Sequence, residues 1–204
     1  NEDERTIVLG EDILDPYGGA FGITRGLTDQ FGNRVISTPI SEAGIVGVAT
    51  GLALNHFRPI AEIMFGDFTT LVMDQLLNHA SKFRWLSNDQ TMAPIVVRTP
   101  MGGRRGYGAT HSQSLEKHFC GVPGLTVGAQ STLHDPLSLL RFAVSQSVDP
   151  ILLIEHKTSY GEPLIDCPAN RKRQIIGPES LPTILISWPN IARDGIIFCY
   201  GGMV

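Results

Sequence analysis

Residues 34–65, "RVISTPISEAGIVGVATGLALNHFRPIAEIMF", decide the fold. Two short apolar runs, 34–38 and 59–65, flank a longer segment, 41–55, whose length suits a helix. A strand, a helix and a second strand in this order predict two parallel strands joined by a crossover helix. This unit is typical of α/β proteins.

The same alternation continues on both sides. We expect further strands at 6–10, 94–99, 125–129 and 150–156, and further helices at 23–31, 69–85, 113–120 and 134–147. Continuous apolar runs indicate strands that are covered on both faces. The sequence therefore predicts an α/β fold: an open, mostly parallel sheet with helices on both faces. Ligands of such sheets usually bind beyond the carboxyl ends of the strands. We therefore expect the site in the loops that follow 34–38, 59–65 and 94–99.

Composition excludes several classes of protein. The chain has 204 residues, 42% of them hydrophobic, which suits one domain with a sizeable core. A formal charge of −4 offers no basic field for nucleic acid. The three cysteines, Cys120, Cys167 and Cys199, are too widely spaced to predict disulfides or a zinc site, and a reducing compartment fits them. No stretch approaches the roughly 20 apolar residues of a membrane span, so we expect a soluble protein.

Domain boundaries are predicted near the end of the chain. Residues 161–193 are rich in Pro, Gly and polar side chains, which favours a linker after a domain at 1–160. Residues 194–204 contain "DGIIFCYGG", which reads as the first strand of a following domain. Because the chain starts without Met and stops after this run, we expect a piece of a longer polypeptide.

Glu42 is the first candidate for chemistry. Ser41 is a good N-cap residue, and the helix dipole favours Glu42 in the first turn by roughly 0.3 to 1 kcal/mol. On a helical wheel Glu42 shares a face with Val46, Ala49 and Ala53, opposite a stripe of Gly44, Gly47 and Gly51. We expect both faces to be buried. An unpaired buried carboxylate costs several kcal/mol, so Glu42 needs a partner that shares its proton. Capping and chemistry both remain open at this stage.

Two further candidates lie in loops. Phe68, between a strand and a helix, is either a core residue or a flat wall for a heteroaromatic ring. His111 lies in a glycine-rich segment, 99–114, that resembles a mobile loop, although a lone His is more often structural. This segment matches neither common phosphate-binding glycine motif. Ser112 beside His111 does not form a catalytic triad, because no orienting acid is evident.

Seven segments in the same order resemble the β-subunit of the thiamine-diphosphate-dependent component of 2-oxoacid dehydrogenases, over about residues 6 to 160. They are "VLGEDI", "YGGAFGITRGL", "TPISEAGIVGVATGLAL", "RPIAEIMFGDF", "MDQLLNHASKFRW", "PIVVRTPMGG" and "HSQSLEKHFCGVPGL". The resemblance implies a pyrimidine-binding domain of the transketolase type, followed from 194 by the start of the family's carboxy-terminal domain. The implied activity is oxidative decarboxylation of a 2-oxoacid and acyl transfer to lipoyl.

The resemblance also implies roles for the candidates. Glu42 falls on the glutamate that hydrogen-bonds the aminopyrimidine nitrogen, and Phe68 on the aromatic that stacks against the pyrimidine. His111 falls on a histidine near the substrate. No residue of this chain is implied as a metal ligand. The implied compartment is the bacterial cytoplasm or the mitochondrial matrix.

A missing motif implies partners. The family holds the diphosphate and magnesium with a GDG followed by Asn, and "GDF" at 66–68 does not match it. The implied holder is an α-subunit or α-like domain, in an assembly of two α and two β, with a lipoyl-bearing acyltransferase core as a further partner. The segment 143–150, "AVSQSVDP", departs from the family's potassium-associated segment, so potassium is not implied.

Three alternatives remain. One is a carbon transfer like that of transketolase or deoxyxylulose-phosphate synthase, and a second is a non-catalytic assembly module. A plain nucleotide-binding domain is disfavoured, because no phosphate loop is evident. The sequence does not choose among pyruvate, branched-chain oxoacids and acetoin as substrates.

Overall fold

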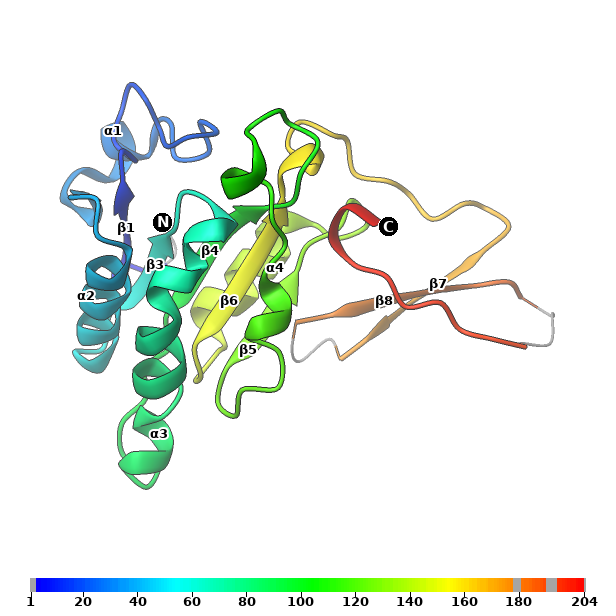
Figure 1. Ribbon diagram of the computed structural model, residues 1–204. Helices are drawn as coiled ribbons and strands as arrows, with labels where there is room; N and C mark the ends of the chain where they lie inside the picture. Colours follow the sequence, from blue (N-terminus) through cyan, green and yellow to red (C-terminus); the bar gives the residue numbers. More distant parts are fainter. Residues whose placement is uncertain (1–2, 178–180, 190–193, 204) are drawn as a thin grey trace.

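The computed structural model describes residues 3–177, 181–189 and 194–203. Among them, six strands form one sheet in the order β2-β1-β3-β4-β6-β5, and every neighbouring pair is parallel (Figure 1). The strands are β1 (Thr6–Glu11), β2 (Val35–Thr38), β3 (Arg58–Glu62), β4 (Val96–Met101), β5 (Thr126–Ala129) and β6 (Ile151–His156). The predicted α/β fold with a parallel sheet is confirmed.

The helices of the described residues are mostly short. The α-helices are α1 (Leu27–Phe31), α2 (Glu42–Leu54), α3 (Phe83–Leu86) and α4 (Pro136–Ser145). The 3₁₀ and π segments are η1 (Gly32–Arg34), η2 (Gly66–Val72), η3 (Gln75–Ala80), η4 (Ala109–His111), η5 (Glu116–His118), η6 (Lys157–Ser159) and η7 (Gly201–Met203). None of these helices has the length and apolarity needed to cross a lipid bilayer.

Alternate residues of the central strands pack on opposite faces of the sheet. Val97, Leu152 and Ile154 belong to one buried cluster, which includes residues of α2 and of η2 and η3. Val96, Ile151 and Leu153 belong to a second cluster, which includes Ala143 of α4. Because side chains of a strand alternate between faces, the two clusters lie on the two sides of the sheet. Helices therefore cover both faces, as predicted.

The helix expected at 69–85 is broken into η2, η3 and α3. Its apolar stripe is buried as expected, at Val72, Leu76 and Ala80. These side chains recur every four residues, which exceeds the 3.6 residues of a regular α-helical turn. The wider π turn keeps them on one face, and the N–H of Ser81 donates to the carbonyl of Leu76 at 3.1 Å.

Two other expected helices are much shorter. The helix expected at 23–31 begins only at Leu27, because Gly26 has a φ of 84° that no helix accepts. The helix expected at 113–120 is reduced to η5. There the carbonyl of Gln113 accepts a hydrogen bond from the N–H of Gly102 at 3.2 Å, which ties residue 113 to the end of β4 instead of to a helix.

The segment 161–193, expected to be a linker, contains regular structure in its described part. Lys172–Ile176 (β7) and Thr183–Ser187 (β8) pair as an antiparallel hairpin. Their β-branched residues were the signal that the Pro and Gly content obscured. Residues 178–180 and 190–193 lie outside the described residues.

The strand expected within 194–204 is not found in the described part, 194–203, which ends in η7. A strand requires a neighbour for its hydrogen bonds, and no described residue pairs with this run. Gly202 instead lies against His156, where an added Cβ would be 2.7 Å from Nδ1. The division into domains stays a prediction.

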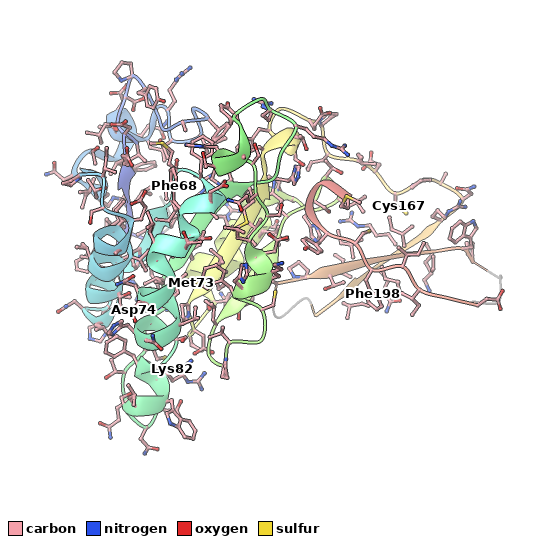
Figure 2. All side chains as sticks on the ribbon, viewed as in Figure 1. Phe68, Met73, Asp74, Lys82, Cys167 and Phe198 are labelled. Carbon is pink, nitrogen blue, oxygen red and sulfur yellow. The ribbon has the colours of Figure 1, made fainter. Side chains whose placement is uncertain are left out.

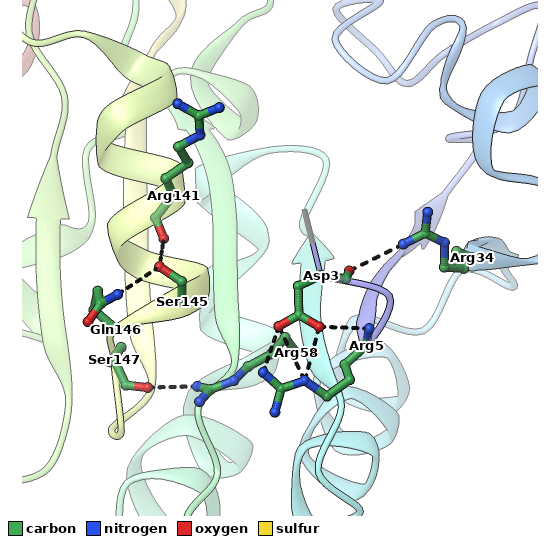
Figure 3. Close-up of polar contacts among 8 residues, drawn as sticks. All are labelled: Asp3, Arg5, Arg34, Arg58, Arg141, Ser145, Gln146 and Ser147. Atoms are coloured by element: carbon green, nitrogen blue, oxygen red, sulfur yellow. Dashed lines mark hydrogen bonds and ion pairs between the residues drawn. The ribbon is translucent and has the colours of Figure 1, made fainter. Parts of the chain in front are cut away.

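Polar contacts join the amino-terminal side of the sheet (Figure 3). Arg5 forms an ion pair with Asp3 at 2.7 Å, and Arg34 donates to the carbonyl of Asp3 at 3.3 Å. Arg58 at the start of β3 donates to the carbonyl of Ser147 at 2.8 Å, which links β3 to the end of α4. These contacts belong to the edge opposite the carboxyl ends of the strands, where the candidate residues lie.

Candidate functional site

Glu42 lies at the first turn of α2, directly after the carboxyl end of β2. Its side chain is buried, with 8% exposed, and no other described residue forms a hydrogen bond or ion pair with it. Ser41 precedes the helix as predicted. Its side chain makes no capping hydrogen bond, so the prediction of a side-chain cap at Ser41 is wrong. Glu42 is therefore a largely buried residue whose carboxylate oxygens reach the surface and have no internal partner.

The two faces of α2 differ more than expected. Val46, Ala49 and Ala53 are buried beside Glu42, as predicted. The glycine stripe of Gly44, Gly47 and Gly51 is exposed in this chain, which corrects the expectation of two buried faces. The apolar Val48 on the same side is 58% exposed. This side of α2 packs against nothing within the described residues that would bury it.

Glu11, at the end of β1, is a carboxylate close enough to Glu42 to feel its charge, and it was not predicted from the sequence. Burial raises the pKa of its carboxyl, and the negative charges of Asp12 and Glu42 raise it further. The position of an acidic residue directly after the apolar run 6–10 was the available signal. Glu11 and Glu42 thus bring two carboxyl groups to the same edge of the sheet.

Phe68 and His111, two of the candidate residues, lie in ring contact. The His111 ring meets Phe68 edge-on, with centroids 5.2 Å apart, and meets Phe65 at 4.7 Å. Phe68 lies on η2, against which α2 packs, at the end of that segment nearest the carboxyl edge (Figure 2). Phe65, Phe68 and His111 thus form an aromatic wall beyond the carboxyl end of β3.

Two buried charges hold the loop that carries His111. The Nζ of Lys157, which is fully buried, donates to the carbonyl of His111 and lies 4.9 Å from the Phe65 ring centroid. Burial lowers the pKa of Lys157, while Asp67 opposes this shift. Asp67 in turn accepts from the side-chain amide of Gln113 at 2.8 Å. The loop is thus fixed on both sides of Ser112.

A second buried cluster lies behind this wall. Arg98 of β4 donates through Nη1 to Glu62 of β3 and through Nη2 and Nε to Glu155 of β6, the last at 3.0 Å. The Tyr160 hydroxyl also donates to Glu155, at 2.6 Å. Burial raises the pKa of Glu62, partly opposed by Arg98. The cluster bonds three adjacent strands near their carboxyl ends.

The sequence carried a signal for this cluster. Arg98, Glu62 and Glu155 each interrupt an otherwise apolar strand, in "PIVVRT", "PIAEIMF" and "PILLIEH". Charged residues are almost never fully buried unless they are paired. Three such interruptions on neighbouring strands predict one shared ion-pair cluster. As for metals, the described residues contain no group of three or more His, Cys, Asp or Glu side chains that could bind an ion.

Comparison with known proteins identifies the class. Residues 1–163 match the family described as "Transketolase, pyrimidine binding domain", and the chain belongs to this family. The resemblance to β-subunits of 2-oxoacid dehydrogenases is confirmed as well. The chain is 37% identical over 206 residues to the β-subunit of acetoin:2,6-dichlorophenolindophenol oxidoreductase of Bacillus subtilis, covering 95% of this chain and 57% of that protein.

Two other relatives come from the same organism. The chain is 45% identical over 159 residues to the β-subunit of 2-oxoisovalerate dehydrogenase, covering 78% of this chain and 48% of that protein. It is 36% identical over 206 residues to the pyruvate dehydrogenase E1 component subunit beta, covering 99% and 60%. The chain therefore spans about half to three fifths of the length of these relatives.

A solved structure supports the fold alone. The structure described as "Split gene transketolase, inactive beta4 tetramer" superposes with a TM-score of 0.57 at 19% identity, covering 76% of this chain and 46% of that chain. At this identity the similarity establishes the shared architecture of the sheet and its helices. It says nothing further about activity.

Proposed function

We propose that this chain supplies the pyrimidine half of a thiamine diphosphate site in a 2-oxoacid dehydrogenase. The observation that carries the proposal is Glu42, a largely buried residue whose carboxylate has no partner among the described residues. A buried carboxylate is stable when a ligand shares its proton. An aminopyrimidine ring nitrogen is such a ligand, and the relatives named above support this assignment.

The residues of the site fit that ring. Glu42 would share a proton between its carboxyl and the ring nitrogen. Phe68 would present a flat apolar surface to the ring. His111 would face the substrate through Nε2, because Nδ1 pairs with the Thr110 hydroxyl at 3.0 Å. When bound, thiamine diphosphate supplies the carbon nucleophile and electron sink of the decarboxylation.

The other half of the site is assigned to a partner. The sequence lacks the GDG and Asn motif, so we place the diphosphate and its magnesium on an α-subunit or α-like domain, in an assembly of two α and two β. A lipoyl-bearing acyltransferase core would receive the acyl group. The proposed compartment is the bacterial cytoplasm or the mitochondrial matrix, in line with relatives from Bacillus subtilis and a rice relative named as mitochondrial.

Reconstitution of turnover tests the proposal. The full chain is mixed with the α-type chain encoded nearest to it, thiamine diphosphate and magnesium, and CO2 release is measured from pyruvate and from branched-chain 2-oxoacids. We expect CO2 release from at least one 2-oxoacid by the mixture and none by this chain alone. A mixture that assembles but releases no CO2 contradicts the proposal and favours an assembly module. Transfer of carbon between sugar phosphates instead favours the transketolase-like alternative.

A further inference from the structure

A cavity of about 550 Å³ lies beside the aromatic wall. Tyr107 lines it and also meets Phe65, with ring centroids 5.5 Å apart, so the cavity borders the aromatic wall. The rest of the lining comes from the loop after β1 and from the chain after β6. It consists of Tyr17, Gly19, Ala20, Phe21, Gly22, Ile23, Arg25, Arg105, Tyr160 and Gly161.

The charged residues that line this cavity are both positive. Arg25 and Arg105 both line it, and among the described residues neither guanidinium has an ion pair or side-chain hydrogen bond. No Asp or Glu belongs to the lining. Two acids lie behind the lining, Glu62 next to Gly19 and Glu155 next to Tyr160, and both are bonded to Arg98. Two guanidinium groups therefore border one cavity without a counter-ion.

A tight turn holds the backbone at Arg25. Gly18 and Gly22 have φ values of 74° and 67°, and the Thr24 hydroxyl donates to the carbonyl of Ile13 at 2.8 Å. An added Cβ at Gly18 would lie 2.7 Å from the Arg25 backbone, so this glycine permits the close turn. The turn fixes the backbone of Arg25 beside the cavity, while the residues Arg25 and Arg105 are both exposed to solvent.

The remaining lining is aromatic. The Phe21 ring lies 5.3 Å from Tyr160 and 5.9 Å from Tyr107, measured between centroids. Guanidinium groups bind carboxylates and phosphates through paired N–H donors. Aromatic walls favour a ligand that also has an apolar body. A free inorganic anion would use the two arginines and leave these rings in water.

We propose that this cavity is a binding site for a small carboxylic acid with an apolar or aromatic body. Arg25 and Arg105 hold the carboxylate, and Phe21, Tyr107 and Tyr160 surround the body. The site is separate from the position of Glu42, so it does not depend on the proposed decarboxylation. Arg105 and Tyr107 belong to the segment that carries His111, so a bound acid would lie beside that segment.

Isothermal titration of the full chain with phenylacetate tests the site. We expect binding that weakens about tenfold or more in Arg25→Gln and in Arg105→Gln, because each loses charge-assisted hydrogen bonds. Arg105→Lys keeps the charge without the planar fork, so its affinity for phenylacetate is expected to lie between those of the wild type and Arg105→Gln. Lys172→Gln removes an exposed positive charge on β7 and serves as the matched control, with unchanged binding. Thermal unfolding confirms that each variant is folded.

Other ligands separate the possible outcomes. Benzyl alcohol, which has the ring without the acid, and inorganic phosphate, which has the charge without the ring, are both expected to bind more weakly than phenylacetate. Absence of phenylacetate binding at millimolar concentration overturns the proposal, as does equal binding by the wild type and the double arginine variant. Tighter binding of phosphate than of phenylacetate overturns the assignment to an acid with an apolar body.

Discussion

Glu42→Gln in the assembled enzyme is expected to lower the rate of 2-oxoacid decarboxylation by about 10² to 10⁴, the range that a positioned proton-transfer group contributes. The amide keeps the size of the side chain but cannot exchange a proton with a ring nitrogen. The folded chain is not expected to lose stability. Glu42 has no bond to lose among the described residues, and neutralising it removes its repulsion of Glu11.

The measurement is CO2 release under saturating substrate, together with urea unfolding of the variant. Glu4→Gln, at an exposed position, is the matched control and should leave both quantities unchanged. A purely helix-terminal role for Glu42 predicts the opposite pattern, namely near-normal turnover and a stability loss of roughly 0.3 to 1 kcal/mol. Observing that pattern would contradict the proposed role.

Arg98→Met is expected to destabilise the chain by about 3 to 5 kcal/mol, because it leaves two buried carboxylates without their partner. Glu62 and Arg98 are only 6% exposed at their side chains, and Glu155 is 13% exposed. A domain is stable by only about 5 to 15 kcal/mol, so this loss is a large fraction of the total. Urea unfolding measures it, and Arg98→Lys, which keeps one charge, should lose less.

The pH dependence gives this prediction a specific signature. Burial already raises the pKa of Glu62 above its ordinary 4.5, and removal of Arg98 raises it further. Above pH 4.5 the folded variant then binds more protons than the unfolded chain, so its stability falls as pH rises. The gap between the wild type and Arg98→Met should therefore narrow on acidification toward pH 4.5. Adding Glu62→Gln and Glu155→Gln should recover part of the loss at neutral pH.

A loss below about 1 kcal/mol for Arg98→Met would contradict the account of the cluster, since it lies under the range for a broken buried pair. So would a gap between the wild type and the variant that does not change with pH. Either result would mean that the carboxylates find other partners once Arg98 is absent.

Periodic apolar patterns predicted the sheet well. The runs at 6–10, 34–38 and 150–156 lie within one or two residues of β1, β2 and β6, because buried parallel strands leave an unbroken apolar signature. The helix after Ser41 was equally clear. The break in 69–85 was not predictable from hydrophobic content alone, since an α-helix and a π turn both bury residues spaced about four apart.

The sequence indicated the candidate site residues themselves but not the residues that hold them in place. Glu42, Phe68 and His111 came from sequence patterns and a family resemblance, and the structure places the last two in ring contact. Lys157 and Asp67 were missed because their roles depend on tertiary contacts between segments far apart in sequence. The exposure of the glycine stripe on α2 was missed too, because spacing marks a face that permits close approach without showing what approaches it.

The central claim, that this chain is half of an active site, is tested most directly by isothermal titration of thiamine diphosphate with magnesium. The full chain is titrated alone and after mixing with the α-type chain. The account predicts weak binding by this chain alone, because no described group of residues here could hold the metal, and tight magnesium-dependent binding by the mixture. Tight magnesium-dependent binding by this chain alone would contradict it.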